Sequence, residues 1–76
     1  MTRDDLKDEL LATDDEFRRL YEEHQECERR LDRLASRSLL SQEDEMEEKR
    51  IKLHKLALKD RMERRVHDRA SQQVAV

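Results

Sequence analysis

The sequence predicts an all-α protein: an antiparallel αα-hairpin of the coiled-coil kind that assembles into a four-helix bundle dimer. Three observations favour it: apolar residues recur at helical spacing, the 76 residues include no glycine or proline, and 49% of them are charged. Without glycine or proline the chain lacks the usual residues for tight turns and helix breaks, which favours long helices. A charged composition with this periodicity is typical of coiled coils. We expect a single domain, residues 1–76, because so short a chain has room for one core.

The first long helix is predicted over about residues 14–36. Two start signals compete, at Thr2 and at Thr13, and each can form a capping box with an acid three residues later. The Thr13 box is the better one, because Glu16 is placed to reach back. Residues 3–12 are therefore expected to be helical but either kinked away or frayed. The apolar stripe alternates spacings of three and four, as in a heptad repeat. It consists of Phe17, Leu20, His24, Cys27, Leu31 and Leu34, and its spacing continues back through Thr13 and Leu10 to Leu6.

The turn is predicted over residues 37–41, where serines favour caps over helix interior. Ser41 is a reasonable N-cap for a second helix over about residues 42–70, and the tail 71–76 is expected to fray. So short a linker between long helices implies antiparallel neighbours. Both helices start acidic and end basic, so folding back sets each acidic start beside the basic end of the other helix.

The second helix is apolar on two nearly opposite sides, at about 100° per residue. One side completes the hairpin seam and consists of Ile51, Lys55, Leu58, Met62 and Val66. A reversal near residue 39 sets Leu20 against Leu58 and Cys27 against Ile51, with His24 near Lys55.

The other side consists of Met46, Leu53, Leu56 and Ala57. One hairpin can cover only one side of this helix, so we expect the second side to contact a second copy of the chain. The simplest closed arrangement is a two-fold dimer with the two second helices at the centre of the bundle.

The segment "IKLHKLALKD", followed by Arg61 and Met62, resembles the Leu-Lys-x-x-Lys-Leu-x-Leu-Lys-Asp-x-Ile signature of the YdcH-like small bacterial proteins. The upstream segment "DEFRRLYEEHQECERRL" is similar to that family's first helix, through Phe17, Leu20, His24 and Leu31. "LLSQEDEMEEKR" resembles the family's turn, with Gln42 in place of proline, and Leu53 stands where a polar residue is commoner. The resemblance covers about residues 14–66. It implies a small helical hairpin with no established biochemical activity.

The residues predict no enzyme, no cofactor and no catalytic site, because two helices enclose no sheltered pocket. His24 and Cys27 lie three residues apart and could both contact a metal ion from one helix face. A His-x-x-Cys pattern alone is a weak metal signal, so we interpret both as seam residues and expect no metal site.

The predicted function is a protein–protein interaction module that self-associates, with its outer surface available to a larger protein partner. A small RNA- or ribosome-associated protein is the alternative, since residues 49–69 carry nine Lys/Arg and three Asp/Glu. Nucleic acid is the less favoured partner, because the net charge is −3 and this segment has no aromatic residue for base stacking. We expect no signal peptide and no membrane span. With Cys27 as the only cysteine, a cytoplasmic location fits best.

Overall fold

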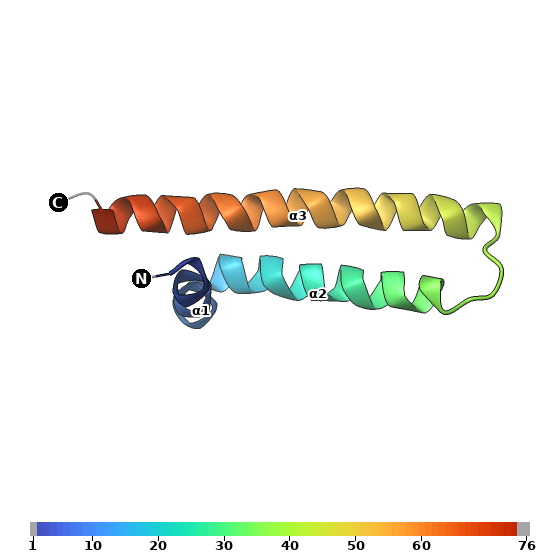
Figure 1. Ribbon diagram of the computed structural model, residues 1–76, viewed down its shortest axis with the longest axis horizontal. Coiled ribbons are helices and arrows are strands. Elements are labelled where there is room, and N and C mark those ends of the chain that lie inside the picture. Colours follow the sequence, from blue (N-terminus) through green and yellow to red (C-terminus); the bar gives the residue numbers. More distant parts are fainter. Residues whose placement is uncertain (1, 75–76) are drawn as a thin grey trace.

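The computed structural model describes residues 2–74, and over these residues the regular structure is entirely helical. The helices are α1 (Arg3–Thr13), α2 (Asp15–Ala35) and α3 (Gln42–Val74). This confirms the predicted all-α class. In Figure 1, α2 and α3 lie side by side and run in opposite directions, and a short loop joins them at one end. The result is a rod-like molecule of 55 × 19 × 17 Å.

The start of α1 is a reciprocal capping box at Thr2. The Thr2 hydroxyl accepts a hydrogen bond from the Asp5 amide at 3.2 Å, and the Asp5 carboxylate accepts one from the Thr2 amide at 3.3 Å. Both bonds satisfy amides that the first turn of a helix leaves without partners. The weaker of the two predicted start signals is therefore a complete capping box.

The break between α1 and α2 is made by Asp14, and the prediction of a capping box at Thr13 was wrong. Asp14 is extended, with φ −114° and ψ 107°, and its Oδ1 accepts hydrogen bonds from the amides of Glu16 and Phe17. The Thr13 hydroxyl instead donates to the Glu9 carbonyl of its own helix, at 2.8 Å. A carboxylate one residue later accepts two amides at once, so it outcompetes the threonine hydroxyl as a cap.

The extended backbone at Asp14 turns α1 across the other two helices. In Figure 1, α1 is seen almost along its axis, whereas α2 and α3 run across the view. Its buried residues Leu6 and Leu10 pack with Phe17 of α2 and Val66 of α3. Two arrangements are predicted for residues 3–12, a kinked helix and a frayed one. The structure shows the kinked helix. Thr13 is exposed, because the kink interrupts the stripe that the sequence continues through it.

The start of α3 is a second reciprocal box, with Ser41 as the cap. The Ser41 hydroxyl accepts from the Asp44 amide at 3.1 Å, and the Asp44 carboxylate accepts from the Ser41 amide at 3.2 Å. The end of α3 differs from the prediction, because the helix continues through the first part of the expected frayed tail 71–76, as far as Val74. No glycine or proline stops it there. Residues 75–76 lie outside the described part of the chain.

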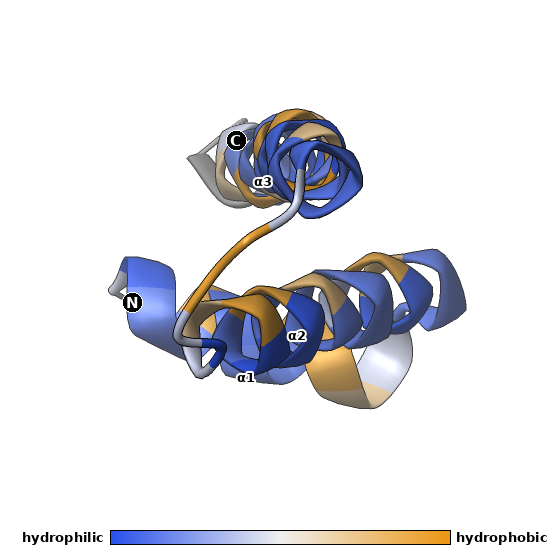
Figure 2. Cartoon of the chain, turned by 90° about the vertical axis from the view of Figure 1, so that its right-hand side faces the viewer, coloured by the Kyte–Doolittle hydropathy of each residue, from blue (hydrophilic) through white to orange (hydrophobic). Residues whose placement is uncertain are grey.

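The core consists of two clusters along the inner side of α3. The first lies between α2 and α3 and contains Leu20, Cys27, Leu34, Ile51 and Leu58. The second lies where α1 crosses the hairpin and contains Leu6, Leu10, Phe17 and Val66, while Met62 packs against both. Figure 2, viewed from the loop end, shows that α3 also carries apolar residues on the side turned away from α2.

Candidate interaction surface

The predicted hairpin seam lies between α2 and α3, and its apolar members are buried or half-buried. Its polar members, His24 and Lys55, are half-buried at its edge. Buried in the seam are Phe17, Leu20, Cys27, Leu34, Ile51, Leu58 and Val66, and half-buried are Leu31 and Met62. Burial of this one face is what holds the two long helices together, because it removes the apolar side chains of the seam from water.

The register of the two helices can be read from ion pairs across the hairpin. Near the open end, Arg65 Nη2 lies 2.9 Å from Asp14 Oδ2. In the middle, His54 Nε2 lies 3.6 Å from Glu23 Oε2. Both pairs join residues that a reversal near residue 39 brings within one helical turn of each other.

Glu28 is a seam residue that the sequence reasoning missed. Its Oε1 lies 3.3 Å from Lys55 Nζ and 3.8 Å from His24 Nδ1. The predicted register places His24 near Lys55 without a counter-charge, and Glu28 supplies that charge. The available signal was its position four residues after His24, on the same side of the helix.

Cys27 lies in the core, at 6% exposure. Burial raises the pKa of its thiol, so the sulfur stays protonated and is a poor nucleophile and a poor metal ligand. Within residues 2–74, no group of three or more His, Cys, Asp or Glu side chains is arranged to hold a metal ion. The local geometry of Cys27 is that of a small apolar core residue.

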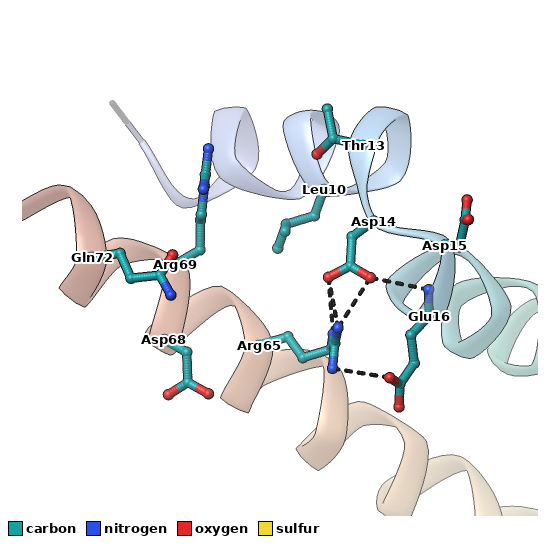
Figure 3. A pocket seen from close by; sticks show the side chains of 9 residues that line it. All are labelled: Leu10, Thr13, Asp14, Asp15, Glu16, Arg65, Asp68, Arg69 and Gln72. Carbon is teal, nitrogen blue, oxygen red and sulfur yellow. Dashed lines mark hydrogen bonds and ion pairs between the residues drawn. The ribbon is translucent and has the colours of Figure 1, made fainter.

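Asp14 both caps α2 and binds α3. Arg65 forms a fork on its carboxylate, with Nε 3.0 Å from Oδ2 and Nη2 3.1 Å from Oδ1, and Arg65 Nη1 lies 3.3 Å from Glu16 Oε2 (Figure 3). Partial burial raises the pKa of Asp14, but the Phe17 amide and the Arg65 guanidinium outweigh it and hold the pKa below its ordinary value of 3.8. The carboxylate therefore links the start of α2 to the C-terminal third of α3.

Two open hollows flank the crossing of α1. The larger, about 630 Å³, lies between the end of α1, the start of α2 and α3, and Figure 3 shows Arg65 reaching across it to Asp14. The smaller, about 330 Å³, is lined by apolar side chains such as Phe17 and Met62 and by Lys55 and Lys59. Both arginines of the larger hollow are paired with acids, because Arg69 pairs with Glu9 as Arg65 does with Asp14.

The second apolar side of α3 is uncovered in the single chain. Leu53 is 68% exposed, Met46 59% and Leu56 58%, and Ala57 is exposed as well. These residues form a face of α3 turned away from the hairpin seam, which we name the outer face of α3. Sequence reasoning missed Leu39, which is 86% exposed in the loop. No periodic pattern marks a lone loop residue, so nothing in the sequence signals it.

The fold is that of a small helical protein with an uncovered apolar face on α3. The chain belongs to the family described as "Protein of unknown function (DUF465)", which matches residues 17–66. The matched segment runs from Phe17 to Val66 and contains the seam and the outer face of α3, while α1 lies before it. No curated protein and no solved structure matches the chain. Among residues 2–74, no helix is long and apolar enough to cross a membrane.

Proposed function

We propose that the protein is a small interaction module that self-associates through the outer face of α3. The observation that carries the proposal is the exposure of Leu53, Leu56 and Met46 on a helix whose opposite side is already buried. Scattered apolar residues are normal on protein surfaces, but these three lie along one side of one helix. The role is one of binding, without catalysis or a cofactor.

The free energy available at this face is large relative to the stability of so small a protein. Fully burying one leucine or methionine contributes roughly 1.5–3 kcal/mol, before the cost of ordering side chains. A chain of this size typically has only about 5–10 kcal/mol of stability in total. A second copy supplies an identical stripe, and an isologous contact closes without leaving a free end. Two hairpins joined in this way form the four-helix bundle dimer that the sequence predicts.

The experiment is a double substitution on the outer face, Leu53→Glu with Leu56→Glu, followed by light scattering behind a sizing column. We expect a monomer that is largely unfolded, because two carboxylates replace the apolar contact. The matched control is Arg19→Glu, a change to the same residue on α2, where Arg19 is exposed. The control should keep the mass of the unmodified protein. A double variant that stays dimeric would contradict the proposal.

The RNA-binding alternative has less support than self-association. Several bases of α3 are held by acids of the same chain: Lys52 by Glu48 at 3.0 Å, and Arg65 by Asp14. Bases paired in this way are less available to phosphate. A mobility shift with RNA that weakens steeply with salt would favour the alternative.

Three finer assignments belong to the same proposal. The motif from Ile51 to Met62 supports placing the chain with the YdcH-like proteins, and the family match is compatible with that name. The single cysteine supports a cytoplasmic location. The outer surface of the dimer is available to a larger protein partner, for which affinity purification from the native cytosol is the test.

A further inference from the structure

We infer that two copies pair α3 against α3 in the antiparallel sense, with Lys49 of each chain beside the partner's Asp60. This inference rests on the proposed self-association and adds to it the orientation, the register and the charged residues that fix them. The observations behind it are the order of side chains along the outer face and the ion pairs that the single chain does and does not form.

The outer face is nearly symmetric about its midpoint. Leu53 and Leu56 lie at its centre, Lys49 lies four residues before Leu53, and Asp60 lies four residues after Leu56. When two copies of such a helix run in opposite directions about that midpoint, Leu53 of each faces the partner's Leu56. The same register sets Lys49 level with the partner's Asp60, and it does so twice because the contact is two-fold.

Lys49 and Asp60 also lie within the width of the face. At about 100° per residue, both fall between Leu53 and Leu56 around the helix, Lys49 about 40° and Asp60 about 20° from Leu53. They continue the alternating three- and four-residue spacing of the leucines, as the a and d positions of a heptad do. Lys49 therefore meets the partner's Asp60 on the leucine stripe itself, where a polar residue at a seam position fixes register at a cost in stability.

Within residues 2–74, Lys49 and Asp60 belong to the charged residues of α3 that form no ion pair, as do Lys59, Arg61 and Arg64, whereas three nearby bases are paired. Arg50 lies 3.8 Å from Glu47, Lys52 lies 3.0 Å from Glu48, and Lys55 lies 3.3 Å from Glu28. Within the described part of the chain, neither Lys49 nor Asp60 forms an ion pair, and both are exposed. A base and an acid that flank an apolar face, unpaired and equidistant from its centre, are complementary to a reversed copy of that face.

A parallel pairing of the same face would oppose like charges. Lys49 would meet the partner's Lys49, and Asp60 the partner's Asp60, along with the acidic start and the basic end of each helix. Like charges in direct opposition disfavour a contact, so the charge pattern selects the antiparallel arrangement. Apolar burial supplies most of the attraction in either orientation, and the charges decide between them.

The first test is a charge exchange measured by sedimentation equilibrium at low salt. Lys49→Glu and Asp60→Lys should each raise the dimer dissociation constant roughly tenfold, because each change places two repulsive pairs in the contact. The double variant should regain most of the affinity, since it restores both pairs with their signs exchanged. The controls are Arg19→Glu and Glu22→Lys, which make the same changes of charge at exposed positions on α2. Single variants that dimerise as tightly as the controls would overturn the register.

The second test reads the orientation directly, in a background with Cys27→Ala so that introduced thiols are the only ones. A mixture of the Lys49→Cys and Asp60→Cys variants should form a 49–60 disulfide between chains under mild oxidation. Lys49→Cys alone should not, because eleven helical residues at about 1.5 Å each separate the two positions 49 in an antiparallel pair. Efficient 49–49 disulfides would overturn the antiparallel arrangement. The tests distinguish this inference from the proposed function. If the unmodified protein is monomeric, both the proposed self-association and the antiparallel register are wrong. If the dimer is sensitive to Leu53→Glu but not to Lys49→Glu, only the register is wrong.

Discussion

Individual side chains at the helix ends decide where this chain bends, and Asp14 has the largest part. It satisfies the amides of Glu16 and Phe17 and accepts the fork from Arg65. The sequence reveals an acid-rich segment at this position, but it does not reveal which residue is the cap. Thr13 and Asp14 both suit the role, and the choice depends on Arg65, which is 51 residues away in the sequence. That contact exists only once the hairpin has formed, so local patterns cannot predict it.

We predict that Asp14→Ala lowers the free energy of unfolding by about 1–2 kcal/mol, through loss of the cap and of the Arg65 contact. Thr13→Ala should lower it by much less, because the Thr13 hydroxyl bonds only within α1. Urea unfolding followed by circular dichroism measures both. Equal losses for the two variants would contradict the assignment of the cap to Asp14.

The lowered pKa of Asp14 predicts a dependence of stability on pH. A carboxyl group whose folded pKa lies below its unfolded value contributes stability above the unfolded value, and that contribution is lost as pH falls through the folded one. The difference in unfolding free energy between the unmodified protein and Asp14→Asn should therefore be full at pH 6 and shrink below about pH 4. A difference that stays constant down to pH 2 would contradict this assignment.

At the scale of the helices, periodicity alone places the apolar residues of the predicted seam on one side of each helix. The stripe from Phe17 to Leu34 needs no long-range information. Several of the charged residues at the helix ends pair with residues nearby in the sequence, whereas the charge pattern predicts pairs between the two helices. The acidic start of α3 pairs with Arg37 through Asp44 at 2.8 Å, whereas Arg29 and Arg33 contact Glu26 within α2. A side chain in mid-helix reaches a neighbour one turn away more easily than the other helix.

We predict that Leu10→Ala loosens α1 before it unfolds the hairpin. Leu10 is 6% exposed, and it packs in the cluster that joins α1 to Phe17 and Val66. Removing a buried leucine side chain lowers stability by roughly 2–5 kcal/mol. A helix as short as α1 cannot lose that much packing free energy and stay packed against α2 and α3. Hydrogen exchange should accelerate throughout α1, with much smaller changes at Leu20 and Leu58. The exposed Ala12→Ser change is the control, and uniform acceleration over all helices would show that α1 is not a separate unit.

For the whole molecule, we propose that one hairpin is half of the folded unit. The sequence predicts the outer face of α3 because Met46, Leu53, Leu56 and Ala57 fall on one side of the helix by periodicity alone. The identity of the partner cannot be predicted in the same way. A stripe of apolar residues indicates which side of the helix must be covered, but it does not indicate which molecule covers it. The symmetric positions of Lys49 and Asp60 add the information that favours a second copy.

The most direct measurement is the mass of the unmodified protein in solution, by sedimentation equilibrium at tens of micromolar, combined with circular dichroism of the same sample. One chain has a mass of 9.3 kDa. We expect a fully helical species of twice that mass, which dissociates on dilution and loses helix content as it does so. A folded, helical 9.3 kDa monomer at that concentration would contradict the account.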